Sequence, residues 1–279
     1  MLGALLAFLG GFFTEASSSL TKIIFAEQKI PYYFFAFLFS AVNAVIFFLI
    51  ALLGGESLAL SPHSLPTFSL RIVLEIIQLE LTIRASVHAD RTLFGALRVL
   101  TIPLLLCIDI LLGYTLSLIQ LSGMLLVVLA LGFYFLHTSF RKAGMWYALL
   151  TSIGAAFTIS LFKYDIEHWN SIATEQFFLT AILSLYFFVF VLRDWRHHVL
   201  IVPPARKLFS ILASSGMSST LNSFAYHYGP ASLILAFVRA SSVFWSFLSG
   251  IAYFGEVQIR RKILCCIVLV FAILLMLYG

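Results

Sequence analysis

Charged residues are scarce in this sequence. Only 10% of the 279 residues are charged, whereas 62% are hydrophobic. In ordinary soluble domains about 25% of the residues are charged and roughly 45–50% are apolar. So few charged side chains cannot cover the surface of a water-soluble fold of this size. The composition therefore predicts an all-α integral membrane protein.

Cysteine is also scarce, and its spacing carries no metal or redox signature. Cys107, Cys265 and Cys266 form no CxxC or Cys/His pattern, so we interpret them as small residues in helix cores. The sequence has no HExxH or GxSxG motif of an enzyme and no Walker motif. It predicts a protein that is not an enzyme, needs no cofactor or metal and is not driven directly by ATP.

Ten long apolar segments fill most of the chain. Each holds about the 20 residues that an α-helix needs to cross a bilayer, and the longest connection, 193–206, is too short for a further domain. Pro103 removes a backbone donor and predicts a kink in its segment. We therefore expect one bundle of ten transmembrane helices. The segments are 3–25, 31–53, 66–84, 90–112, 117–137, 145–163, 172–192, 207–227, 230–253 and 259–278.

Basic residues gather on one side of the expected bundle. The connections after odd-numbered segments hold thirteen lysines and arginines, whereas the opposite side holds only Arg71 and Lys163. Short basic loops stay in the cytoplasm, so this bias places both termini outside. No basic stripe with aromatic side chains favours nucleic acid. We expect a multi-pass protein of the cell (inner) membrane, with the lipid bilayer and no nucleic acid as its partner.

The chain repeats a unit of five segments. ALLAFLGGFFT, starting at Ala4, aligns without gaps with ALLTSIGAAFT, starting at Ala148, and six of eleven positions are identical. Arg98 and Arg239 lie at matching places in the fourth and ninth segments. Because five is odd, the second copy must enter the membrane upside down, as in many secondary transporters. The predicted repeats are 1–138 and 144–279.

The LGYTLSLIQLSG and FGEVQIRRK stretches resemble the drug/metabolite transporter (DMT) superfamily, and in particular its EamA-type members. These have Gly-Glu after helices 4 and 9, before a last hydrophobic helix. Gly255 and Glu256 match this pattern; Gly113 matches in the first half, but Tyr114 replaces the glutamate. The resemblance implies a secondary transporter. It also implies cytoplasmic termini, opposite to what the basic residues indicate.

Small and polar side chains recur at helical spacing on several segments, so they share a face of each helix. Small residues alone are equally typical of helix packing in membranes. Charge is different, because a charge in hydrocarbon costs at least about 2.5–3.5 kcal/mol. We expect the polar faces to converge on a binding site near the membrane midplane. The candidate substrate-binding residues are Glu15, Ser18, Arg98, Thr158, Asn222, Tyr226, Arg239, Ser242 and Trp245.

The two arginines suggest the class of ligand. A guanidinium group binds a carboxylate or phosphate bidentately, although Arg239 is also compatible with a structural ion pair. Glu15 would neutralise one arginine, bind a substrate ammonium or take up a proton. Trp245 is more typical of core packing than of ring stacking on a substrate.

The hypothesis is a transporter of a small anionic or zwitterionic metabolite, with an amino-acid-like compound as first candidate. A coupling proton or an exchanged metabolite would be a further partner. Two alternatives remain open: a flippase for a lipid or lipid precursor with the same fold, and an exchanger of nucleotides or phosphorylated metabolites.

The third segment contains acid–base pairs at a spacing of four residues. Arg71 precedes Glu75 and Glu80 precedes Arg84 at the interval that lets side chains meet on one helix. We expect both pairs to form within the helix. Asp109, near the end of its segment, is expected at the membrane interface.

The orientation can be tested with a fluorescent protein that matures only in the cytoplasm. Fused after Gly279, it should stay dark, because the basic connections hold the other side of the bundle in the cytoplasm. The same tag inserted in the 193–206 connection should fluoresce. Whole-cell fluorescence is the measurement, and bright cells with the tag after Gly279 would contradict this topology.

Overall fold

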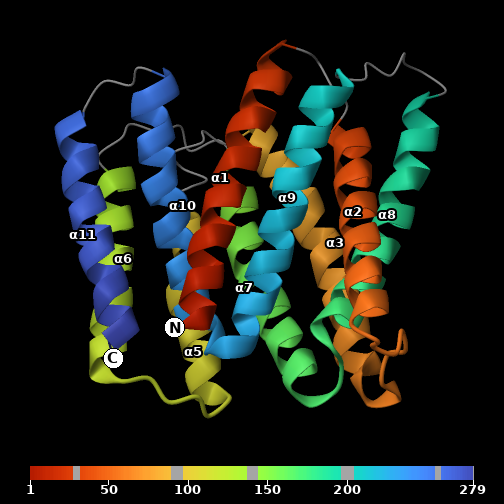
Figure 1. Ribbon diagram of the computed structural model, residues 1–279, viewed down its shortest axis with the longest axis horizontal. Coiled ribbons are helices and arrows are strands. Elements are labelled where there is room, and N and C mark those ends of the chain that lie inside the picture. The colour runs from red at the N-terminus through yellow and green to blue at the C-terminus, as the bar shows by residue number, and fades with distance from the viewer. Residues whose placement is uncertain (28–31, 89–96, 137–143, 196–203, 255–258, 279) are drawn as a thin grey trace.

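The computed structural model describes the chain except residues 28–31, 89–96, 137–143, 196–203, 255–258 and 279. Its described elements are all helical, which confirms the all-α class (Figure 1). The stretch between the two predicted repeats, 139–143, and the Gly255–Glu256 pair lie outside the described residues. The helices are α1 (Leu2–Glu27), α2 (Tyr32–Leu53), α3 (Leu65–His88), α5 (Thr101–Leu111), α6 (Leu118–Leu136), α7 (Met145–His168), α8 (Ile172–Trp195), α9 (Ala205–Ala225), α10 (Ala231–Phe254) and α11 (Ile259–Tyr278), with 3-10 turns η1 (Pro62–Ser64) and η2 (Tyr226–Tyr228).

Three helical stretches among the described residues are long and apolar enough to cross a membrane. They are α2, α7 and the part of α8 that spans Ile172–Arg193. Large apolar side chains such as Leu53, Leu111 and Phe133 are exposed on the outside of the bundle. Such a surface suits acyl chains and is compatible with a membrane protein.

The helices run side by side, and most of the close pairs join one half of the chain to the other (Figure 1). α1 packs against α9 and α10, α3 against α7, and α2 against α8. α5 lies between α10 and α7, and α6 pairs with α11 at one edge of the bundle. The two halves therefore form one interleaved unit.

The largest apolar core lies where α5, α6, α10 and α11 meet. Its fully buried side chains include Ile102, Leu105, Val127, Leu131 and Leu269. Because these residues recur at intervals of three or four, each helix presents a continuous apolar stripe to its neighbours. This core fixes α10, and with it Arg239, against α5.

The fourth apolar segment is interrupted rather than continuous. Residues 97–99 are helical, Leu100 forms a turn, and α5 begins at Thr101. Pro103 has no N–H and cannot bond to the carbonyl of Val99, four residues earlier. Leu100 keeps right-handed helical torsion angles, so only the hydrogen-bonding pattern is interrupted and the kink stays a prediction.

Glycine lets α6 and α11 approach closely. A Cβ atom added at Gly123 would lie 2.6 Å from Met276 Cγ and 2.9 Å from the backbone oxygen of Ala272. Gly132, on the same helix, has nothing within 4 Å of such an atom. Only the first glycine is required by the packing.

Gly123→Ala should therefore destabilise the protein by about 1–3 kcal/mol, the usual cost of overpacking. Gly132→Ala is the matched control and should leave stability unchanged or slightly raised, since alanine favours the helix. Thermal unfolding of the purified variants in detergent gives the comparison. Equal melting temperatures for the two variants would contradict the close α6–α11 packing.

Candidate functional site

The structure brings together Arg98, Arg239 and Tyr226. Arg98 lies just before α5 and Arg239 on α10, and the two guanidinium groups are within electrostatic range of each other. The Tyr226 side chain, in η2, interacts electrostatically with Arg239. Three of the nine predicted residues, contributed by both halves of the chain, therefore share one region.

Arg239 has no protein anion to neutralise it in the described part of the chain. It is half-buried, its Nε is buried without a hydrogen-bond partner, and the ion pairs found there involve other residues. Two like charges held close together repel each other, more strongly in a medium of low dielectric constant than in water. An anion bound by both guanidinium groups would remove this repulsion.

Asn222 is part of a polar contact between α1 and α9. Its Nδ2 donates to Ser218 Oγ at 3.2 Å, and Ser218 Oγ lies 2.5 Å from Thr14 Oγ1. The side-chain oxygen of Asn222 is buried and has no partner. Gly10 makes room for this amide, since a Cβ there would overlap it. The site thus offers one unused acceptor beside α1.

Trp245 belongs to an aromatic cluster between α10 and α1. Its ring centroid lies 5.5 Å from that of Phe8 and 4.9 Å from that of Phe12. Its indole nitrogen is buried without a hydrogen-bond partner. Ser242 donates to the carbonyl of Val238 at 2.8 Å, within its own helix. Trp245 is half-buried and packs against the aromatic side chains of α1, and its role in core packing or ring stacking stays a prediction.

The remaining candidates lie on α7 and α1. Thr158 donates to Gln78 Oε1 on α3 at 3.0 Å and so belongs to the α3–α7 interface. Glu15 accepts a hydrogen bond from Ser19 at 2.8 Å, and Ser18 is exposed. In the described contacts Thr158 is a packing residue between helices rather than a neighbour of the arginines.

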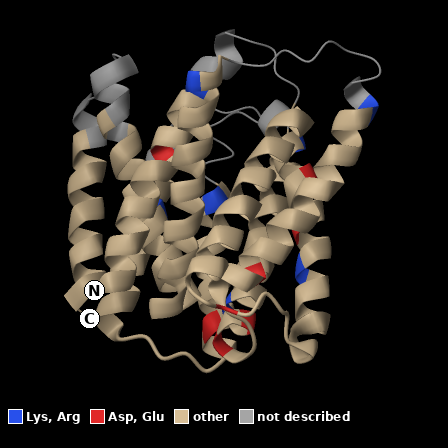
Figure 2. Ribbon diagram, turned by 45° about the vertical axis from the view of Figure 1, so that its right-hand side comes forward, with Lys and Arg blue, Asp and Glu red and all other residues tan. Residues whose placement is uncertain are grey.

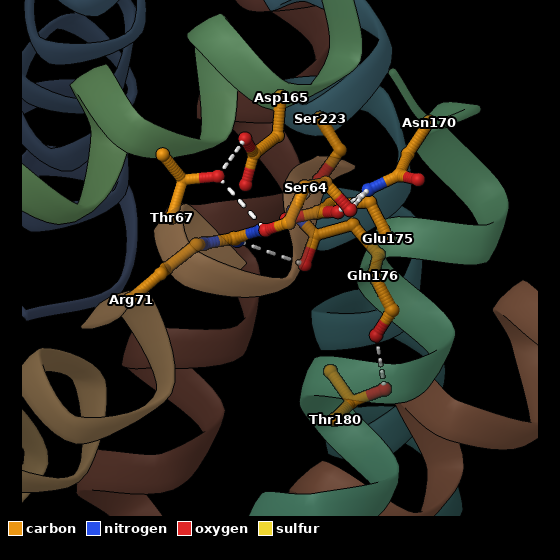
Figure 3. A network of polar contacts seen from close by, with 9 residues as sticks. All are labelled: Ser64, Thr67, Arg71, Asp165, Asn170, Glu175, Gln176, Thr180 and Ser223. Atoms are coloured by element: carbon orange, nitrogen blue, oxygen red, sulfur yellow. Dashed lines mark hydrogen bonds and ion pairs between the residues drawn. The ribbon is translucent and has the colours of Figure 1, made fainter. Parts of the chain in front are cut away.

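A second polar cluster, which the sequence analysis did not predict, lies where η1, α3, α7 and α8 meet (Figure 3). Arg71 Nη1 lies 2.9 Å from Glu175 Oε1, and both side chains are buried. Asn170 donates to the other oxygen of Glu175 at 2.6 Å. The ion pair of Arg71 thus joins α3 to α8, whereas Glu75, its expected partner, stays within electrostatic range without a direct bond.

The expected Glu80–Arg84 pair is also replaced by contacts between helices. Glu80 accepts hydrogen bonds from the hydroxyl of Tyr33 at 3.2 Å and from that of Tyr186 at 3.1 Å. Arg84 is exposed, and no ion pair joins it to Glu80 in the described structure. Glu80 is therefore satisfied by hydroxyl groups of α2 and α8, not by its own helix.

The cluster continues along α3, α8 and α9. Arg71 also lies 3.4 Å from the side-chain oxygen of Gln176, and Gln176 donates to Ser223 on α9 at 3.0 Å. The guanidinium carbon of Arg71 stands 4.5 Å from the centre of the Phe162 ring. One buried arginine therefore contacts side chains from α7 and α8, and α8 extends the network to α9.

Lys163 and Asp109 form further polar contacts at the same end of the bundle, where Figure 2 shows acidic positions gathered. Lys163 is buried; its Nζ lies 2.6 Å from Glu167 and donates to the backbone oxygen of Tyr226 at 2.6 Å. Asp109 is buried and accepts the N–H of Ser232 at 2.7 Å. A carboxylate at the start of α10 is favoured by the helix dipole. Asp109, expected at the interface, is thus a buried cap.

The sequence held one signal for this end of the bundle. Asp165, Glu167 and Glu175 are three of only twelve acidic residues and fall within eleven positions. In a chain with so little charge, this density indicates a polar site. Their partners on α3 could not be identified, because Arg71 and Glu175 are 104 residues apart.

Comparisons with known proteins address only the fold. No family model and no curated protein matches the chain. Solved structures do match, and one of them, a crystal structure of a protein, superimposes with a TM-score of 0.77. The match covers 98% of this chain and 95% of that chain, at 13% identity. The two proteins share a fold.

The buried Arg71–Glu175 ion pair predicts a large loss of stability when one of the two residues is replaced. Arg71→Met and Glu175→Gln should each cost about 3–5 kcal/mol, because each leaves an uncompensated buried charge or acceptor. The combined variant should lose less than the sum. Arg84→Met, at an exposed arginine on the same helix, is the control. Thermal unfolding in detergent measures all four, and additive losses would contradict a direct interaction.

Proposed function

We propose that the protein is a secondary transporter that moves a small anionic or zwitterionic metabolite across the cytoplasmic membrane by alternating access. The observation that carries this proposal is that Arg98 and Arg239 lie within electrostatic range of each other. Two permanently charged groups from opposite halves, with no neutralising contact found for Arg239 in the described residues, favour an anionic ligand.

The helix pairs support two inverted repeats, residues 1–138 and 144–279, within a ten-helix bundle. Exchanging the first five helices for the last five leaves the main pairs unchanged. The α1–α9 pair becomes α7–α3, and α1–α10 becomes α7–α5. In the α2–α8, α5–α10 and α6–α11 pairs the two helices take each other's place, so each pair stays the same. A two-fold relation of this kind supports a binding site between the halves, where Arg98 and Arg239 lie within electrostatic range of each other.

The neighbouring polar groups favour an amino-acid-like compound as the ligand. A carboxylate suits the forked guanidinium groups. The unpaired side-chain oxygen of Asn222 is an acceptor for an ammonium group, and Glu15, on the adjacent helix α1, supplies a negative charge. The arginines would bind the carboxylate of a zwitterion, and Asn222 with Glu15 would bind its ammonium group.

The arginine pair also fits a phosphate, so two further candidates remain: a flippase for a lipid or lipid precursor, and an exchanger of nucleotides or phosphorylated metabolites. A phosphate accepts the same bidentate hydrogen bonds as a carboxylate. Competition between amino acids, phosphorylated metabolites and short-chain phospholipids for the purified protein would separate these classes.

Arg239→Ala should weaken binding of the ligand found in such a screen. Loss of a charge-assisted hydrogen bond costs about 1.5–3 kcal/mol, which is roughly a ten- to hundred-fold increase in Kd. Arg98→Ala should do the same, and Arg84→Ala, at an exposed arginine, should not. Ligand-induced thermal shifts and uptake into liposomes give the comparison. Unchanged binding and uptake in Arg239→Ala would refute the site.

A further inference from the structure

Asp165, on α7, is an unusual acid in the cluster of Figure 3. Its side chain is fully buried. Oδ1 lies 2.5 Å from Thr67 Oγ1, and Oδ2 is buried without a hydrogen-bond partner among the described residues. A buried carboxylate normally has several donors, since the charge is otherwise costly. The surroundings of Asp165 are those of a neutral carboxylic acid.

Glu175 has the opposite surroundings and carries the negative charge of the cluster. One oxygen is paired with Arg71 at 2.9 Å, and the other accepts from Asn170 at 2.6 Å. The Asp165 and Glu175 carboxyl groups interact electrostatically with each other and with Arg71. Two interacting carboxyl groups that share one arginine do not both ionise readily, which favours retention of one proton by the pair.

The two close contacts of the Thr67 hydroxyl are compatible with a proton on Asp165. Thr67 Oγ1 lies 2.9 Å from the backbone oxygen of Ser64 and 2.5 Å from Asp165 Oδ1. A threonine hydroxyl has one hydrogen and can give it to only one of these two oxygens. When the hydroxyl donates to Ser64, the short contact with Asp165 is satisfied only if the acid supplies a hydrogen.

Other charged groups around Asp165 come from each helix that forms the cluster. Arg71 on α3, Glu175 on α8 and His168 on α7 itself interact electrostatically with it in the described structure. His168 is exposed, whereas Arg71 and Glu175 are buried as an ion pair. The proton of Asp165 is therefore the group whose loss changes the net charge of the buried cluster.

We propose that Asp165 binds a proton in a buried site formed with Thr67 and Glu175, and that this proton is the coupling ion of transport. The coupling role rests on the proposed transporter function; the proton site does not. Asp165 belongs to α7, whereas Thr67 lies on α3, so the site joins the two halves. Loss of the proton leaves a net negative charge, which favours separation of these helices and entry of water.

The proton site can be tested on the purified full-length protein by infrared difference spectroscopy. A pH step between about 6 and 10, above the range in which exposed carboxyl groups titrate, should remove a protonated-carboxyl C=O band. Asp165→Asn should lack this band, and Glu56→Gln, at an exposed acid of the same end, should keep it. Thr67→Val, which preserves the acid, should shift the band. A full band in Asp165→Asn would overturn the site.

The coupling role can be tested in liposomes with a radiolabelled amino-acid mixture. A pH gradient should accelerate uptake by the natural protein several-fold, and uptake by Asp165→Asn should be the same with and without the gradient. Equal acceleration of both proteins, or acceleration by a sodium gradient alone, would overturn the coupling role. No uptake by either protein, with the infrared band intact, would overturn the amino-acid transport function and the coupling while leaving the proton site in place.

Discussion

The free energy of a charge in a medium of low dielectric constant is the constraint on which the rest of this structure depends. Most buried charges are compensated: Arg71 by Glu175, Lys163 by Glu167, and Asp109 by the start of α10. Each compensation joins or caps helices, so these polar contacts also fix the packing. Arg239 and Asp165 lack such compensation in the described residues, and the proposed ligand site and proton site are built on them.

The sequence was sufficient for the class of fold because apolar length and helical periodicity are local properties. The described helices fall on the ten apolar segments, with α5 shortened by the interruption before Pro103. The proximity of Arg98 and Arg239 agrees with their matching places along the chain. Both inferences needed only spacing and composition.

Contacts between side chains on different helices could not be predicted from the sequence, and the reason is physical. The spacing of Arg71 and Glu75 is right for an intrahelical pair, but such a pair is worth only about 0.2–0.5 kcal/mol. Arg71 pairs with Glu175 rather than Glu75 because Arg71 and Glu175 are both buried and Asn170 satisfies the second carboxylate oxygen of Glu175. Which faces of α3 and α8 meet is decided by packing of the whole bundle, and no local pattern contains that information.

The interruption at Leu100 has a consequence for the geometry between the two guanidinium groups. Leu100 keeps helical torsion angles, but the helical hydrogen-bonding pattern is incomplete here because Pro103 offers no N–H to the carbonyl of Val99. Rotation about a few torsion angles between residues 99 and 101 can reposition this side chain while α5 remains anchored on α7 and α10. The distance between the two guanidinium groups is then adjustable locally, without a change in the packing of α5.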